Sequence, residues 1–306
     1  MKVLVTGATG FVGPKVANAI VDAGHEVRVL ERKPGSWSKA GIRCQEAVQG
    51  DMTDADSLRR AVAGVETVVH LVAIRQGRPE AFERIMTQGT RDLVAAARDA
   101  GVGRFVLMSA LGTSEETKDV VPYYAAKWNM ERAVEASGIP YVIFRPTFIF
   151  GRDGGILPTF AKLARLAPVT PITGSGEQRI QPIWIDDVAA FFARSVDREG
   201  VENETFVLGG PDVVSWNEFW ERLKRTLGKS RPSVHMPMWF MRANALVTER
   251  LPGNIPLTRD LLKMLEAGDN TGDTRPALET FGLSVMPLDE QLRRGTGRAP
   301  EPDAAS

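Results

Sequence analysis

The fold of this chain is decided by TGATGFVG, residues 6–13. The stretch follows a short apolar run, residues 3–5, and precedes a helical pattern that begins at Pro14. In a loop between a strand and a helix, Gly7 permits the tight turn, Gly10 lets the backbone approach a pyrophosphate, and Gly13 lets helix and strand pack closely. Free N–H groups and the positive dipole end of the helix favour phosphate there. The stretch therefore predicts a dinucleotide-binding loop.

Outward from this loop, residues 1–150 alternate short β-branched runs with helical segments, which is typical of a parallel sheet with crossover helices. We expect strands at 3–5, 27–30, 67–72, 105–108 and 141–144, and helices at 14–23, 55–63, 79–100 and 123–137. Strands that are apolar on both faces are buried ones. The pattern predicts an α/β fold, a doubly wound parallel sheet of the Rossmann type, with the nucleotide-binding domain at residues 1–150.

The regular alternation of strand and helix patterns ends after Gly151. Residues 152–182 are rich in Gly and Pro, and segments 183–185, 186–197 and 206–208 read as a return to the sheet. A capping box of Ser215 and Glu218 starts a helix over 215–227. We therefore expect a smaller, mainly helical substrate lobe within 151–294 and a disordered tail at 295–306. The large apolar residues of 236–241 are expected in the core of this lobe, or alternatively in a substrate pocket or lid.

Composition excludes several classes of function. The 306 residues carry 38 Lys+Arg and 38 Asp+Glu, so no global field draws the chain to nucleic acid. Cys44 is the only cysteine, and His25, His70 and His235 show no ligand spacing, so we expect neither a disulfide nor a metal site. No apolar run reaches the ~18 residues of a transmembrane helix. We expect a cytoplasmic protein, with peripheral membrane or complex association left open.

Further segments resemble one family. TGATGFVG is similar to the TGxxGxxG loop of extended and atypical short-chain dehydrogenases/reductases, which are NAD-dependent epimerase/dehydratase-like proteins. GDMTD at 50–54, HLVA at 70–73, YYAAK at 123–127, FRPTFIFG at 144–151 and QPIWIDDVA at 181–189 follow in the family's order. PLTRDLLKML at 256–265 resembles the NADPH-binding alpha-subcomplex accessory subunit of respiratory complex I and its bacterial relatives. The resemblance covers roughly residues 1–290.

The resemblance implies NADP or NAD as cofactor. It places near that cofactor Gly7, Thr9, Gly10, Phe11, Val12, Gly13, Glu31, Arg32, Asp51, Met52, Leu71, Val72, Ala73, Lys127 and Pro146. Two neighbours disagree about which nucleotide is bound. Glu31, at the end of the second strand, can accept hydrogen bonds from ribose hydroxyls and favours NAD. Arg32 can clamp a 2′-phosphate and favours NADP, and the choice stays open.

Tyr123 and Lys127 lie four residues apart at the start of a helix and share one face. In the family this pair is catalytic: tyrosine exchanges a proton with the substrate oxygen, and a nearby ammonium favours the phenolate. The family's third member, a hydroxyl after the fourth strand, falls on Ala110 here. Either Ser109 or Thr113 substitutes for it, or the triad is incomplete.

Arg179 lies near the position at which extended relatives hold a substrate anion, and an exposed arginine without such a role is the alternative. The sequence thus predicts an NAD(P)-dependent oxidoreductase or epimerase acting on a carbonyl or hydroxyl of a small molecule, for which an apolar compound is one candidate. The alternative is a non-catalytic NAD(P)H-binding structural or regulatory protein of the complex I type, which Ala110 favours. Substrate is expected at the carboxyl ends of the strands.

Overall fold

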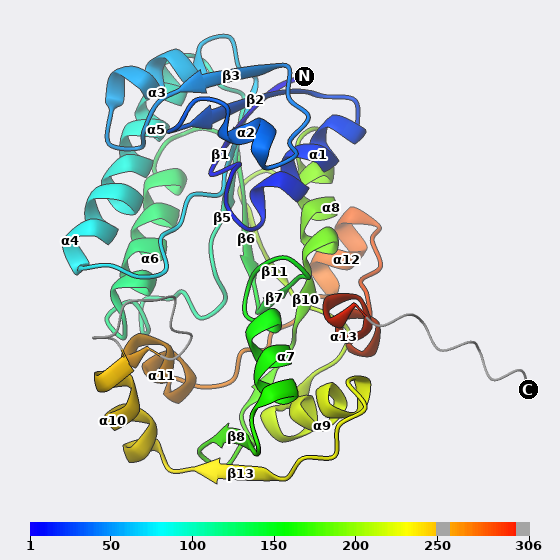
Figure 1. Cartoon of the computed structure of the whole chain (residues 1–306). Coiled ribbons are helices and arrows are strands. Elements are labelled where there is room, and N and C mark those ends of the chain that lie inside the picture. The colour runs from blue at the N-terminus through cyan, green and yellow to red at the C-terminus, as the bar shows by residue number, and fades with distance from the viewer. Residues whose placement is uncertain (249–257, 298–306) are drawn as a thin grey trace, which may run out of the picture. The chain divides into compact units, whose positions relative to one another are not determined.

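The computed structural model, which describes residues 1–248 and 258–297, contains a seven-stranded sheet (Figure 1). Its strand order is β11-β6-β5-β4-β1-β2-β3, and every neighbouring pair is parallel. The prediction of a Rossmann-type α/β fold is confirmed. The strands are β1 (Lys2–Thr6), β2 (Glu26–Glu31), β3 (Glu46–Gln49), β4 (Thr67–His70), β5 (Arg104–Met108), β6 (Tyr141–Pro146) and β11 (Glu204–Leu208).

Helices cover both faces of this sheet (Figure 1). One layer holds α3 (Ala55–Val62), α5 (Gly89–Asp99) and α6 (Pro122–Glu135), which pack against one another in that order. The other layer holds α1 (Gly13–Asp22), α8 (Ile185–Ser195) and α12 (Arg275–Phe281), again in contact in that order. A short helix, α2 (Ser36–Lys39), follows β2.

The helix expected over 79–100 is present but not uniform. It begins as α4 (Pro79–Phe82), continues as a π-helical turn, η1 (Glu83–Gln88), and ends as α5. A π turn closes its hydrogen bonds from residue i to i+5 instead of i+4, so it shifts the face on which its side chains lie. Arg84 lies within this π turn, so the turn determines the direction of its side chain.

The chain divides into two compact units. Unit 1 comprises Met1–Pro146, Ile185–Leu208 and Asp273–Ser284, and unit 2 comprises the intervening segments Thr147–Trp184 and Gly209–Gly272 with the residues from Val285 onward. Residues 273–284, which lie within the expected lobe of 151–294, thus belong to unit 1. The cause is packing: Phe281 of α12 lies against Phe144 of β6 and Phe206 of β11, with ring centroids 5.6 and 5.2 Å apart.

Unit 2 is built on short elements around aromatic side chains. The ring of Phe160 in α7 (Leu157–Leu166) contacts Trp216, Phe219 and Trp220 of α9 (Trp216–Thr226) edge to face. Residues 183–184 form a strand that pairs with residues 149–150 and not with the central sheet, so the expected return of this segment to that sheet is wrong. The two-stranded pairs are β7 (Ile149–Phe150) with β10 (Ile183–Trp184), β9 (Arg179–Ile180) with β12 (Val214–Ser215), and β8 (Thr170–Thr173) with β13 (Ser233–Met236).

The remaining helices of unit 2 correct two expectations. α10 (Met238–Thr248) leaves Trp239 71% and Phe240 39% exposed, so residues 236–241 are not the core of the lobe. Met238 and Met241 of this helix are half-buried, and Ala245 is buried. Gly295 and Thr296 are helical in α13 (Leu288–Thr296), and the rest of the expected tail, 298–306, lies outside the described residues. α11 (Arg259–Glu266) is the other helix. No helix in the described ranges is both long and apolar enough to span a bilayer.

Candidate active site

The loop of residues 6–13 is a tight backbone turn in which Gly7 and Gly13 have no room for side chains. Gly7 has φ +75°, and a Cβ there would lie 2.9 Å from the backbone of both Leu71 and Val72. A Cβ at Gly13 would lie 2.2 Å from the carbonyl oxygen of Ala8. The N–H of Gly10 donates to the carbonyl oxygen of Gly7 over 3.0 Å and closes the turn. These contacts satisfy the steric requirements expected from the sequence.

The N-terminus of α1 is left available by this loop. Val12 is the N-cap residue and provides no side-chain hydrogen bond, and Pro14 follows at the first turn. The helix therefore presents N–H groups that no cap satisfies, beside the exposed Thr9 and Gly10. Such an uncapped terminus with a glycine cradle fits the pyrophosphate of a dinucleotide.

His70 joins the start of the loop to the helix layer. Its Nδ1 lies 2.6 Å from the hydroxyl of Thr6 and its Nε2 lies 3.0 Å from that of Thr90. The Thr90 hydroxyl donates to the carbonyl of Met86 over 2.5 Å, so it accepts from His70, and Nε2 carries the proton. Burial, with the Lys127 charge nearby, lowers the pKa of His70 to about 3. The ring is thus a neutral link between Thr6 and Thr90.

The two residues that disagreed about the nucleotide differ in their surroundings. Glu31 is buried, and its carboxylate accepts from the N–H of Gly35, the hydroxyl of Ser36 and the N–H of Trp37 at 2.8, 2.8 and 3.1 Å. Burial alone would raise the pKa of Glu31, but these bonds outweigh it and lower the pKa. Arg32 is exposed, and its guanidinium has no hydrogen bond or ion pair within the described residues. Glu31 holds its own turn, and Arg32 is the residue presented to solvent.

The other positions predicted near the cofactor lie at the carboxyl ends of neighbouring strands. Asp51 follows β3 and accepts two hydrogen bonds from Thr53, while Met52 is buried in the core. Residues 71–73 follow β4, with Leu71 buried and Ala73 exposed. Pro146 ends β6, and its carbonyl accepts from the N–H of Leu111 over 2.9 Å. Because parallel strands end at the same edge, these positions and the loop share one edge of the sheet.

Lys127 is fully buried in α6. Its Nζ donates to the carbonyl oxygen of Met108, the last residue of β5, over 2.6 Å. Burial lowers the pKa of Lys127 to about 7, although the charge of Glu131 opposes the shift. The Nζ lies 5.9 Å from the centre of the Tyr123 ring. The structure therefore brings the predicted pair together at the end of β5.

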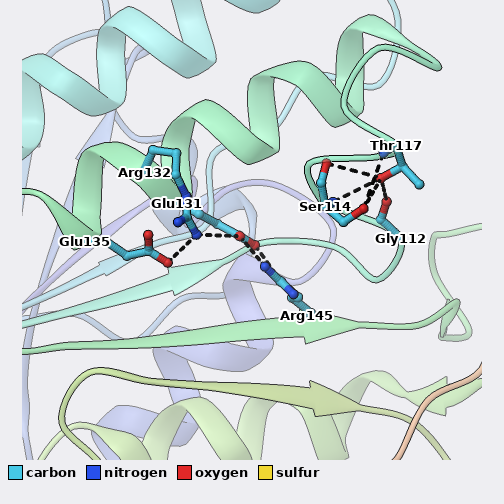
Figure 2. A network of polar contacts seen from close by, with 7 residues as sticks. All are labelled: Gly112, Ser114, Thr117, Glu131, Arg132, Glu135 and Arg145. Atoms are coloured by element: carbon cyan, nitrogen blue, oxygen red, sulfur yellow. Dashed lines mark hydrogen bonds and ion pairs between the residues drawn. The ribbon is translucent and has the colours of Figure 1, made fainter.

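An ion-pair network holds α6 on the sheet one turn after Lys127 (Figure 2). Glu131 is fully buried and accepts two hydrogen bonds from Arg145 of β6, at 2.9 and 2.6 Å. Arg132 pairs with Glu135 at 2.5 Å on the outer side. The carboxylate of Glu131 thus forms a bidentate ion pair with Arg145. This pair attaches α6 to β6 and fixes the helix register that positions Lys127.

Tyr123 lies half-buried at the N-terminal end of α6. Burial raises the pKa of its phenol, the neighbouring Tyr124 adds to this shift, and the charge of Arg75 opposes it. The phenol therefore keeps its proton at neutral pH. Tyr124, the alternative tyrosine, is buried against the loop that follows β5: its hydroxyl would lie 2.7 Å from a Cβ built on Gly112.

Ser109 and Thr113 are both buried, and neither hydroxyl has a hydrogen-bond partner within the described residues. The segment that carries Thr113 is closed by its own contacts: Thr117 bonds to the carbonyl of Gly112, and its hydroxyl lies 3.1 Å from that of Ser114 (Figure 2). A buried hydroxyl without a partner is uncommon in proteins and often marks a place where a ligand or water bonds. Substitution by Ser109 or by Thr113 for the third catalytic residue, or an incomplete triad, stays a prediction.

Arg179, the residue proposed for a substrate anion, belongs to unit 2 and already has a partner. Its backbone N–H and its Nε bond to the two carboxylate oxygens of Asp269, at 2.9 and 2.7 Å. The backbone and side-chain hydrogen bonds from Arg179 lower the pKa of Asp269. The structure gives Arg179 a local role, and its role toward substrate stays a prediction.

The sequence did not single out two arginines near the site. The charge of Arg75 acts on Tyr123, and that of Arg84 acts on Asp51. Both lie in the segment that follows β4, where no motif marks them. The Met108 carbonyl that binds Lys127 was also missed, because a backbone acceptor leaves no signal in the sequence.

Comparisons with known proteins agree with this geometry. Residues 3–209 match the NAD dependent epimerase/dehydratase family. The 2-alkyl-3-oxoalkanoate reductase of Stenotrophomonas maltophilia (strain K279a) is 27% identical, covering 96% of this chain and 98% of that protein. NADH dehydrogenase [ubiquinone] 1 alpha subcomplex subunit 9 of Arabidopsis thaliana is 26% identical over 82% of this chain and 64% of its own. An NADPH-dependent quinone oxidoreductase of Escherichia coli, solved with NADPH, has the same fold: TM-score 0.78, 20% identity, 95% and 98% coverage.

Proposed function

Because this chain belongs to the NAD-dependent epimerase/dehydratase family, we propose that it is an NAD(P)-dependent reductase of a carbonyl compound. The observation that carries the proposal is the Tyr123–Lys127 pair: a phenol that keeps its proton stands beside a fully buried lysine at the end of β5. A protonated phenol is a general acid, which suits reduction of a carbonyl to an alcohol. The loop at 6–13 and the uncapped start of α1 would hold the nucleotide.

The roles of the chain's own residues follow from their contacts. The nicotinamide supplies the hydride when it is bound. Tyr123 gives its proton to the oxygen of the substrate, and Lys127 stabilises the phenolate that remains. Because burial holds the pKa of Lys127 near 7, the side chain exists in both the neutral and the ammonium form at neutral pH, and the ammonium form is the one that stabilises the phenolate. Met108 keeps the ammonium in place through its carbonyl.

The proposed substrate is a small apolar molecule. The reductase from Stenotrophomonas maltophilia, whose name specifies an alkyl-substituted oxoalkanoate, supports this class. Equal numbers of basic and acidic residues agree with a substrate that is not selected by long-range charge. We also propose the cytoplasm as the place of action.

The test compares wild type with Tyr123→Phe. The variant keeps the ring packing and removes only the phenolic oxygen. Oxidation of NADPH and NADH is followed with 2-alkyl-3-oxoalkanoates, quinones, aldehydes and ketones as acceptors. We expect turnover to fall about 10²–10⁴-fold in the variant, while nucleotide affinity stays within twofold. Wild-type turnover that survives in Tyr123→Phe would refute the assignment.

The second candidate function is a non-catalytic nucleotide-binding subunit. The similarity to the complex I subunit over 82% of this chain supports this function. The hydrogen bond of Lys127 also supports it, because its acceptor is the backbone carbonyl of Met108 and not a hydroxyl group. The same experiment separates the two functions. Tight NAD(P)H binding with no turnover on any acceptor class would favour the structural role.

A further inference from the structure

The π-helical turn η1 brings an arginine to the adenosine side of the nucleotide site. The N–H of Gly89 bonds to the carbonyl of Arg84, five residues earlier, so these two residues lie one turn apart on neighbouring faces. In an α-helix, a residue five positions earlier would lie on a different side. The π turn thus directs Arg84 toward whatever Gly89 contacts.

Gly89 packs against the turn that follows β3. A Cβ at Gly89 would lie 2.9 Å from the carbonyl oxygen of Met52 and 3.0 Å from its Cβ. The helix therefore touches the turn of residues 51–52 so closely that only glycine fits. This contact places the Arg84 end of η1 beside Asp51, on the edge of the sheet where the loop also lies.

Arg32 reaches the same place from the other side. Glu31 of β2 pairs with Gln49 of β3, and the carbonyl of Glu31 accepts from the N–H of Gly50 over 3.0 Å. Arg32 follows Glu31 and Asp51 follows Gly50, so both residues lie just beyond the end of this strand pair. The charges of Arg32 and Arg84 both help to lower the pKa of Asp51, after the hydrogen bonds from Thr53.

Among the residues that the structure describes, no side chain bonds to either guanidinium. Both are exposed, and neither forms an ion pair or a side-chain hydrogen bond among residues 1–248 and 258–297. Arg84 also lines an open cavity of about 430 Å³ with Arg78, Glu80 and Ala81. Two cations beside one carboxylate leave an excess of positive charge, which suits one more anion.

We infer that Arg84 is a second cation, with Arg32, for the 2′-phosphate of NADP(H), and that η1 is the structural device that positions it. The inference rests on the proposed function, because it needs a nucleotide in the loop at 6–13. A guanidinium binds phosphate oxygens through paired N–H donors, and one on each side of the ribose would hold the group against the charge of Asp51. The consequence is a preference for NADPH over NADH that Arg84 sets in part.

Two pairs of probes isolate the 2′-phosphate. NADPH differs from NADH only in this group, and 2′,5′-ADP differs from 5′-AMP in the same way. Calorimetric titration of wild type with all four needs no turnover. Arg84→Gln should weaken NADPH and 2′,5′-ADP about 10- to 100-fold, as expected for a hydrogen bond to a charged group, and change NADH and 5′-AMP less than twofold.

Arg78→Gln is the matched control. Arg78 is exposed in the same segment and lines the same cavity, but its charge does not contribute to the pKa of Asp51. It should leave all four affinities unchanged. Arg84→Lys, which keeps the charge without the planar fork, should retain part of the preference. In wild type, the preference should fall with added NaCl because the site is exposed, and this dependence should be weaker in Arg84→Gln.

The outcomes distinguish this inference from the function on which it rests. Wild type that binds none of the four probes would overturn the proposed nucleotide binding itself. Wild type that binds NADH and NADPH equally, or a preference that Arg32→Gln removes and Arg84→Gln leaves intact, would overturn the role of Arg84 alone. An unchanged thermal unfolding midpoint in Arg84→Gln confirms that the variant is folded.

Discussion

The loop of residues 6–13 and the Tyr123–Lys127 pair build two parts of the candidate site by different means. In the loop, the proposed function depends on the absence of side chains: Gly7 and Gly13 stand where any Cβ would meet backbone at 2.9 Å or less. In the pair, the proposed function depends on two side chains whose pKa values are shifted by burial. The loop therefore depends on steric space, and the pair depends on the removal of two ionisable groups from water. We expect the loop to respond to added side chains and the pair to respond to pH.

The largest expected effect is steric. Gly13→Ala places a Cβ 2.2 Å from the carbonyl oxygen of Ala8, and neither the loop nor α1 can move without breaking the turn. We expect a loss of about 3 kcal/mol or more in the free energy of unfolding, at the upper end of overpacking in a dense interior. Urea denaturation measures it.

Gly103→Ala is the control for this substitution. Gly103 is exposed, and the nearest atom to an added Cβ is the carbonyl oxygen of Glu66 at 3.6 Å, an ordinary contact. Its free energy of unfolding should stay within about 0.5 kcal/mol of wild type. If both variants lose the same stability, the loop is not specially crowded and the comparison fails.

The next effect separates ligand binding from folding inside the loop. Gly10 is exposed, and a Cβ there would lie 3.2 Å from the carbonyl oxygen of Gly7, a contact that small shifts relieve. Gly10→Val should fold, but its branched side chain would occupy the space that a pyrophosphate needs. We expect affinity for NADPH and NADH to fall about 10²–10³-fold, equivalent to two lost charge-assisted hydrogen bonds. Wild-type affinity in calorimetry would exclude this loop as the pyrophosphate site.

The loop and the central sheet could be predicted because their signals are local. A glycine at φ +75° and runs of apolar residues act through their immediate neighbours. β3 was not predicted, because its residues alternate between half-buried and exposed and are not the apolar run of a central strand. The π turn at 83–88 was not predicted either, since the residues over 79–100 have an ordinary helical pattern.

The electrostatics of the site could be predicted only in part. The sequence identified Tyr123 and Lys127, but their pKa shifts depend on burial that arises when α6 packs on the sheet. Glu31 and Arg32 show the same limit. As neighbours at a strand end they look equivalent, yet the turn over 31–37 encloses one carboxylate and leaves the guanidinium exposed.

The buried lysine gives the third prediction. The pKa of Lys127 is about 7 in the folded chain and is expected near 10.4 when unfolded. Between these values the unfolded state binds more protons, so this lysine makes the free energy of unfolding rise with pH from about 7 upward. Below pH 7 both states are protonated and the contribution is flat.

Lys127→Met isolates this contribution, because methionine fills similar space without a charge. The difference in unfolding free energy between wild type and variant should change by about 2–3 kcal/mol in favour of wild type between pH 7 and 9.5. Urea unfolding at several pH values measures it. Parallel curves over this range would mean that the lysine titrates as it does in water.

The smallest expected effect concerns Glu31, and it tests whether burial or ligand binding explains this residue. Glu31→Gln keeps the size of the side chain but turns one oxygen into an N–H donor that faces donors from Ser36 and Trp37 or from Gly35. We expect a loss of about 1 kcal/mol in unfolding free energy at pH 7. Because the folded pKa of Glu31 is lowered, its stabilisation is present above the ordinary value of 4.5 and disappears as pH falls through the folded pKa. The wild-type advantage over the variant in unfolding free energy should therefore vanish at acid pH.

The same variant tests ligand binding. If the role of Glu31 is to stabilise the turn over residues 31–37, NADH and NADPH affinities should change equally and by less than twofold. A selective loss of NADH affinity would instead show that the carboxylate leaves its three donors to bind the ribose.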